Sequence, residues 1–211
     1  MKNKVAMLSS TVLLLVAVLG CARLSELSKK KKNDNLTNPG SKRSSSFTLD
    51  GKQWNTYTLE NMDATIELPG KPTDKSPVMP AEYRAVFSAM HINAYDEKDF
   101  QSSVTELVPT GAKKFTIKQL ADTSMNALKR QIPDLAYTLD IKSETNAKLN
   151  GAFTKNGKSY DVRGCCIYQK AKPERVWEVL TLAPKDNADA QTASQRMINS
   201  VVFKNSTERC N

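Results

Sequence analysis

Apolar and polar residues alternate in several segments of the chain after residue 52, and this alternation predicts a protein rich in β-strands. The clearest example is the segment 62–68, where Met62, Ala64, Ile66 and Leu68 share one face. A period of two with one apolar face is typical of a strand with one buried side. Strands are predicted over residues 53–59, 62–68, 81–95, 100–108, 135–141, 159–169, 175–182 and 201–203, with residues 143–149 extending the fifth of them.

Residues 81–95 differ from the other predicted strands because both of their faces are apolar. Phe87 lies on one face, and Met90 and Ile92 lie on the other. This pattern indicates a central strand that is covered on both sides. The only histidine, His91, falls on the face of Phe87, and we interpret it as a structural residue in or beside the core.

Two segments have the 3.6-residue period of amphipathic helices. Thr116 followed by Gln119 has the form of a capping box, in which each side chain bonds a backbone group of the other residue. Pro133 should end this helix, because proline removes a backbone donor and clashes with the preceding turn. A second, shorter helix is predicted over residues 189–199.

The turns between the predicted strands are short. Asn150-Gly151 and Asn156-Gly157 are both dipeptides that favour two-residue hairpins. Strands joined by such short turns pair antiparallel, and two helices remain to cover the sheet. The sequence therefore predicts an α+β fold, specifically an α/β/α sandwich with a mostly antiparallel central sheet flanked by helices.

The N-terminal segment 1–20 has the parts of a secretory signal peptide. Lys2 and Lys4 precede an apolar run of 8 residues from Val12 to Leu19, and a small residue, Gly20, follows it. A helix that crosses a bilayer needs about 20 apolar residues, so this run is short for a membrane span.

The residues Val18-Leu19-Gly20-Cys21 resemble the lipobox of bacterial lipoproteins. The resemblance implies signal cleavage between Gly20 and Cys21 and a lipid such as palmitate on Cys21. It also implies a membrane anchor in the bacterial cell envelope, with the folded domain in the periplasm or outside the cell. Two alternatives stay open, namely a signal anchor and an ordinary secretory signal that is cut after Ala22.

Residues 21–47 are polar and charged, and we interpret them as a flexible tether between Cys21 and the domain. The whole chain has a net charge of +9, yet residues 48–211 hold 22 basic and 20 acidic residues. The excess positive charge therefore lies mainly on the tether, where Lys29–Lys32 either contact anionic lipid headgroups or act as a solvated spacer. A nucleic-acid partner is not expected, because binding one requires a basic face on the domain.

Residues 48–204 are long enough for one domain with an ordinary core, and residues 205–211 form a polar tail. Short motifs in this domain resemble the PsbP-like superfamily, which includes Ran-binding Mog proteins and many uncharacterised bacterial lipoproteins. The motifs are Ala64–Pro72, Tyr83, the mid-chain helix, Gly157–Arg163, Arg175–Val179 and Ile198–Phe203. The resemblance implies a central antiparallel sheet flanked by helices, and members that mostly bind or stabilise partner proteins.

No catalytic signature is visible in the sequence. The chain has one histidine, no Gly-x-Ser-x-Gly nucleophile elbow and no Cys-x-x-Cys pair. A catalytic triad needs a base beside its nucleophile, and zinc sites usually combine several Cys and His ligands. We therefore expect no metal, no cofactor and no enzyme activity.

Three cysteines remain once Cys21 carries a lipid. Cys165 and Cys166 are adjacent on a predicted strand, so their side chains point to opposite faces. Cys210 lies in the tail and can reach either of them, and a disulfide there would stabilise the fold. Reduced thiols remain an alternative, and so does a thiol-dependent redox reaction at Cys165 and Cys166.

The loop after the second predicted strand is the candidate contact surface. It begins with Pro69, Gly70, Lys71 and Pro72, and loops held on a rigid sheet often carry recognition. The alternative is a simple connector. Together these features predict a lipid-anchored, non-catalytic envelope protein that binds, assembles or stabilises a partner protein.

Overall fold

The computed structural model describes residues 52–79, 81–97, 99–111, 114–171, 173–204 and 206–210. The predicted signal peptide, Cys21 and the predicted tether lie outside these residues.

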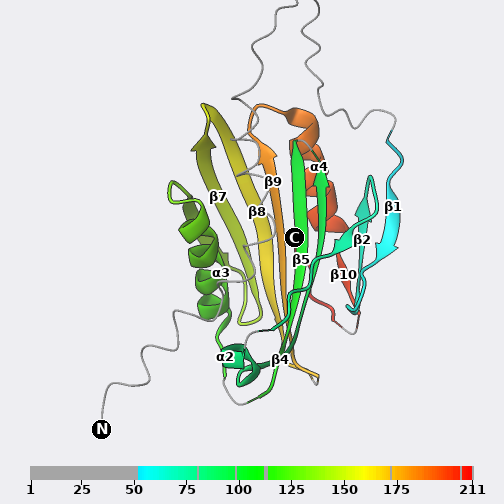
Figure 1. Ribbon diagram of the computed structural model, residues 1–211, viewed down its shortest axis with the longest axis vertical. Helices are drawn as coiled ribbons and strands as arrows, with labels where there is room; N and C mark the ends of the chain where they lie inside the picture. The colour runs from blue at the N-terminus through cyan, green and yellow to red at the C-terminus, as the bar shows by residue number, and fades with distance from the viewer. Residues whose placement is uncertain are drawn as a thin grey trace, which may run out of the picture.

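A seven-stranded sheet forms the centre of the described domain (Figure 1). Its strand order is β3-β4-β5-β9-β8-β7-β6, and every neighbouring pair is antiparallel. The strands are β3 (Thr73–Asp74), β4 (Phe87–Glu97), β5 (Phe100–Pro109), β6 (Ala136–Ile141), β7 (Asn146–Lys155), β8 (Lys158–Gln169) and β9 (Arg175–Pro184). The predicted antiparallel sheet is confirmed.

One face of the central sheet is covered by α3 (Ile117–Gln131). The predicted capping box is present, because Thr116 Oγ1 accepts from Gln119 N at 3.2 Å and Gln119 Oε1 accepts from Thr116 N at 3.1 Å. The helix ends at its C-cap, Ile132, one residue before Pro133. Its buried stripe packs with apolar residues of the sheet into a first core.

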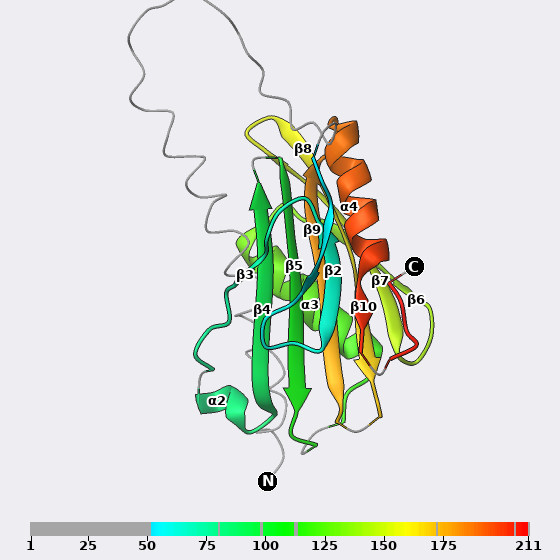
Figure 2. The ribbon, with the colours of Figure 1, turned by 90° about the vertical axis from the view of Figure 1, so that its right-hand side faces the viewer.

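The other face is covered by α4 (Ala188–Ser200) and by a small sheet, as Figures 1 and 2 show. The small sheet has the order β1 (Asn55–Thr58), β2 (Ala64–Leu68) and β10 (Val202–Phe203). Together they bury a second core around Trp177, whose ring centroid lies 4.8 Å from that of Phe203. The predicted α+β sandwich is confirmed, with the small sheet as an added part of one outer layer.

The prediction of one long strand over residues 81–95 is wrong at its start. Ala81–Arg84 form a short helix, α2, and β4 begins only at Phe87. The pairing of β4 with β5 then shifts register between Phe87 and Ala89. The extra residue of such a bulge inverts the alternation, so Phe87 and Met90 both face α3. His91 therefore lies on the opposite face, and its predicted placement beside Phe87 is wrong.

One of the two predicted hairpin turns is correct. Asn156 and Gly157 join β7 to β8 with φ angles of 51° and 75°, the left-handed values that a type I′ turn requires. Asn150-Gly151, by contrast, lies in the middle of β7. The preceding hairpin turns earlier, at residues 142–145, where Lys142 N donates to Asn146 O at 2.9 Å.

Candidate functional site

The predicted contact loop leaves the small sheet and packs its first residues onto the domain. Pro72 is buried, and Gly70 lies against the ring of Tyr95. A Cβ on Gly70 would stand 2.7 Å from Tyr95 Cε2, so glycine allows this close approach. Of the four predicted contact residues, only Lys71 is exposed.

The second half of the loop is held to β4 by several hydrogen bonds. Lys75 N donates to Ile92 O at 2.7 Å, and Ile92 N donates to Ser76 Oγ at 2.9 Å. Asp74 Oδ1 accepts from Ser76 N at 2.7 Å, and the hydrogen bonding of Ser76 lowers the pKa of Asp74. The loop is therefore fixed in place rather than supported at its ends alone.

This fixed loop presents an apolar side chain to solvent. Val78 is 87% exposed, the most exposed large hydrophobic residue of the described chain. The neighbouring Met79 is partly buried against the first core. Val78 was not among the residues predicted from the sequence, although its place between Pro77 and Met79 in a proline-rich loop could have indicated an exposed apolar side chain.

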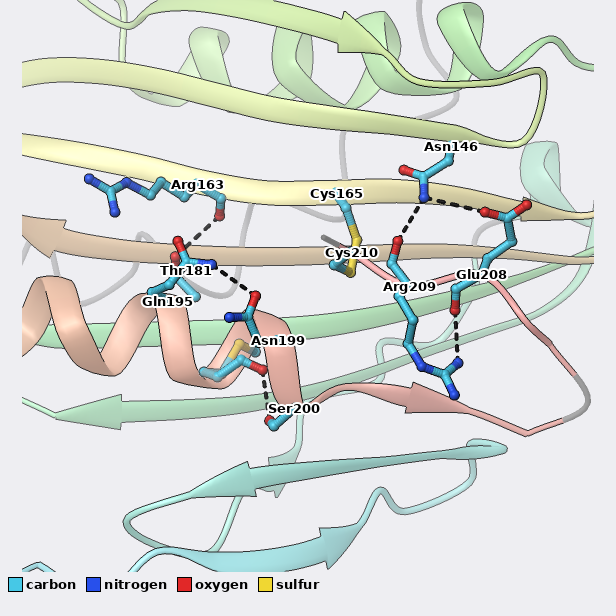
Figure 3. Close-up of a disulfide and its surroundings, with 11 residues drawn as sticks. Asn146, Arg163, Cys165, Thr181, Gln195, Asn199, Ser200, Glu208, Arg209 and Cys210 are labelled. Carbon is cyan, nitrogen blue, oxygen red and sulfur yellow. Dashed lines mark hydrogen bonds between the residues drawn. A yellow bond between two sulfur atoms is a disulfide. The ribbon is translucent and has the colours of Figure 1, made fainter.

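The structure joins Cys165 to Cys210 through a disulfide (Figure 3). Cys165 lies on β8 and faces the second core, where it is 0% exposed, while Cys210 is 4% exposed. The bond closes a sequence separation of 45 residues. It ties the C-terminal tail to an inner strand of the central sheet.

Polar contacts hold the tail beside the disulfide. Asn146 Nδ2, at the start of β7, donates to Arg209 O at 2.7 Å and to Glu208 Oε2 at 3.3 Å, as Figure 3 shows. Thr145 Oγ1 donates to Glu208 Oε1 at 2.7 Å. The tail is therefore a packed part of the domain from Ser206 to Cys210.

Cys166 points to the other face of β8, under α3, and is a free thiol. Its register partner on β9 is Glu178, which accepts a hydrogen bond from Ser124 Oγ of α3. Burial raises the pKa of Glu178 to about 8. Burial, and secondly the charge of Glu178, raise the pKa of the Cys166 thiol. The site favours a neutral acid beside a neutral thiol.

Glu178 was not among the residues predicted from the sequence. On β9 it occupies an inward position between Val176 and Leu180, so the alternation alone could have marked it as a buried acid. Thr105 lies opposite Glu178 on β5, and neither Thr105 Oγ1 nor Glu178 Oε1 has a hydrogen-bond partner among the described residues. Within the described part of the chain, this is a polar inclusion in an otherwise apolar core.

His91 lies half-buried on β4, opposite Glu106 on β5. Glu106 is buried and its Oε1 lies 2.7 Å from Arg175 Nε. Burial raises the pKa of Glu106, and the positive charge of Arg175 partly offsets that rise. The acid is therefore engaged in an ion pair within the fold.

The described residues contain no group of three or more His, Cys, Asp or Glu side chains that could hold a metal ion. Among the helices that the structure describes, none is both long and apolar enough to cross a membrane.

Comparisons with known proteins give similarities of structure only. No protein-family model matches the chain, and no curated protein matches its sequence. The chain is similar to the Ran-binding protein Mog1p of Saccharomyces cerevisiae, with 12% identity and a TM-score of 0.41 over 72% of this chain and 96% of that one. It is also similar to LpqN, a protein involved in cell envelope biogenesis of Mycobacterium tuberculosis, with 15% identity and a TM-score of 0.38 over 75% and 98% of the two chains.

Both TM-scores lie below 0.5, so neither similarity assigns a partner or an activity to this chain. Membership of the PsbP-like superfamily stays a prediction. The α+β class rests on the helices and strands described above.

Proposed function

We propose that this chain is a lipid-anchored protein of the bacterial cell envelope whose folded domain binds a partner protein and catalyses no reaction. The observation that carries the location is the Cys165–Cys210 disulfide. Disulfides form and persist in oxidising compartments outside the cytosol. The disulfide thus supports export independently of the signal-like residues 1–20 and the lipobox ending at Cys21.

The domain offers a surface for such a partner at Val78. An apolar side chain on a loop with fixed backbone loses little conformational entropy on binding, and it gains from removal of its surface from water. Val78 meets both conditions, because the preceding residues Lys75 and Ser76 are bonded to β4. The partner is expected to present a complementary apolar pocket.

A thiol-dependent reaction is the competing function, and the cysteines weigh against it. A reactive cysteine needs an accessible thiol with a lowered pKa. Cys165 is in a disulfide and 0% exposed, and Cys166 is 1% exposed with a raised pKa. Both sulfurs are thus in settings that suppress nucleophilic chemistry.

The proposed lipid anchor predicts both the first residue of the mature chain and an added acyl mass. Protein extracted from membranes should begin at Cys21 and carry added acyl mass, measured by intact mass spectrometry. Cys21→Ser should lose the acyl mass, whereas the control Cys166→Ala should keep it. A polypeptide that begins at Cys21 without acyl mass would contradict the proposal.

Val78→Lys is expected to abolish capture of the partner without changing the melting temperature of the domain. The reason is that a charged side chain at this 87% exposed position would enter the partner's apolar pocket but touches little of its own chain. The measurement is covalent crosslinking in intact cells followed by isolation of the full chain. Capture that survives Val78→Lys unchanged would exclude this loop.

Val202→Lys provides the matched control for that experiment. Val202 lies on β10 and is 42% exposed, so the same substitution adds the same charge at another exposed valine. Partner capture should persist in this variant. If both variants lost partner capture equally, the added charge itself would be the cause, and Val78 could not be assigned to the binding surface.

A further inference from the structure

β6 forms one edge of the central sheet, and no described strand pairs with its outer side. It has 6 residues and contains neither proline nor a bulge. Exposed edge strands of this kind are templates for pairing with another strand, and proteins usually protect them. The opposite edge is protected in this way, because β3 has only 2 residues and Pro77 follows shortly after it.

The register with β7 shows which backbone groups of β6 are free. Lys142 N donates to Asn146 O, so this pair is hydrogen-bonded across the two strands. Antiparallel pairs alternate between hydrogen-bonded and non-bonded. Ala136, Thr138 and Asp140 therefore direct their N–H and C=O groups toward β7. The residues between them direct these groups outward.

The outward-directed residues of β6 are also its apolar ones. They are Tyr137, Leu139 and Ile141, and all three side chains lie on the face of the sheet that α3 covers. Tyr137 and Leu139 are partly buried against the first core, while Ile141 remains 43% exposed. Free hydrogen-bonding groups and incompletely covered apolar surface therefore coincide on the same three residues.

We propose that β6 pairs antiparallel with β6 of a second copy of this chain, about a two-fold axis at Leu139. In this register Leu139 faces Leu139 of the other copy, and Tyr137 faces Ile141. All three outward-directed residues of each strand then donate and accept across the junction. Their six side chains form one apolar cluster that continues the first core from one copy to the other.

The composition of the strand favours a second copy over an unrelated strand, because the strand is complementary to itself in this register. Asp140 is its only charged residue, and Lys142 forms an ion pair with it. Pairing about Leu139 places Asp140 opposite Thr138 of the other copy, where the hydroxyl can donate to the carboxylate. Pairing about Asp140 would instead set two carboxylates opposite each other, which is unfavourable.

Sedimentation equilibrium of the full chain in detergent tests the pairing. The wild type is expected to show a reversible monomer–dimer equilibrium. Ile141→Pro removes an outward N–H that the ladder with β7 does not use, so the monomer should fold while dimerisation weakens about tenfold or more. Ile141→Ala is the matched control, since it shortens the side chain but keeps the N–H, and it should dimerise better than Ile141→Pro.

Cysteine crosslinking tests the register. In the proposed pairing residues 138 and 140 of the two copies are directly opposite in a non-hydrogen-bonded pair, which suits a disulfide. The double variant Thr138→Cys/Asp140→Cys should crosslink into a dimer on oxidation, and neither single variant should. A monomeric wild type, a dimer unaffected by Ile141→Pro, or crosslinking of either single variant would overturn the proposal.

Discussion

Replacing Glu178 with glutamine is expected to flatten the dependence of stability on pH between about pH 4.5 and pH 8. In the wild-type fold the carboxyl is buried and its pKa is raised from 4.5 to about 8. In the unfolded chain the same group ionises near its ordinary value. The folded state therefore binds the proton more tightly, and wild-type stability should fall as pH rises through this interval.

The sign and size follow from the two pKa values. The contribution of Glu178 is fully present below pH 4.5 and is lost as the pH rises through about 8. With about 1.4 kcal/mol for each pKa unit, the loss is at most about 5 kcal/mol. Glutamine keeps an acceptor for Ser124 Oγ and cannot ionise. The variant should therefore be more stable than the wild type at pH 8.

Urea unfolding of the full chain at several pH values measures this difference. Glu144→Gln is the matched control, because Glu144 is exposed and its substitution should leave the wild-type slope largely intact. The free energy of unfolding of Glu178→Gln should still fall with rising pH, but less steeply than that of the wild type, since burial also raises the pKa of Glu106. Parallel profiles for the wild type and Glu178→Gln would show that Glu178 is not a buried acid.

Cys210→Ser is expected to lower the free energy of unfolding by about 4 kcal/mol. The disulfide spans a separation of 45 residues. A crosslink over that length lowers the conformational entropy of the unfolded chain, which stabilises the folded state by about this amount. Loss of the bond should also release the tail, whose other ties are the contacts of Glu208 and Arg209 with Thr145 and Asn146. Proteolysis near residue 206 should therefore accelerate.

Reductant separates the disulfide from other effects of the substitution. Wild type and Cys166→Ala should both lose stability when reductant is added, because both keep the Cys165–Cys210 bond. Cys210→Ser should not respond. If reductant left the free energy of unfolding of the wild type unchanged, the disulfide would not be stabilising.

The features that were predicted correctly from the sequence are those determined by residues close together in the chain. The capping box at Thr116 and Gln119, the stop before Pro133 and the Asn156-Gly157 turn each depend on residues a few positions apart. The alternation on β8 also placed Cys165 and Cys166 on opposite faces, as the two cores show. Local hydrogen bonding and backbone sterics are sufficient for such features.

The features that the sequence did not reveal depend on contacts between distant segments. The bulge after Phe87 is set by how β4 pairs with β5, and it inverted the predicted face of His91. Asn150-Gly151 is drawn into β7 because strands pair with it on both sides. The exposure of Val78 follows from the bonds that hold its loop to β4. Tertiary pairing overrides local preference at each of these positions.

The small sheet has a consequence for the order in which the chain can complete its fold. β2, near the start of the domain, pairs with β10 near its end, with Val202 opposite Thr65. Strand contacts of such long range form slowly, because a long loop must close before they stabilise anything. The first core can assemble from residues that are synthesised earlier, but the second core waits for the last strand. Folding of this domain is therefore expected to end with its two ends meeting.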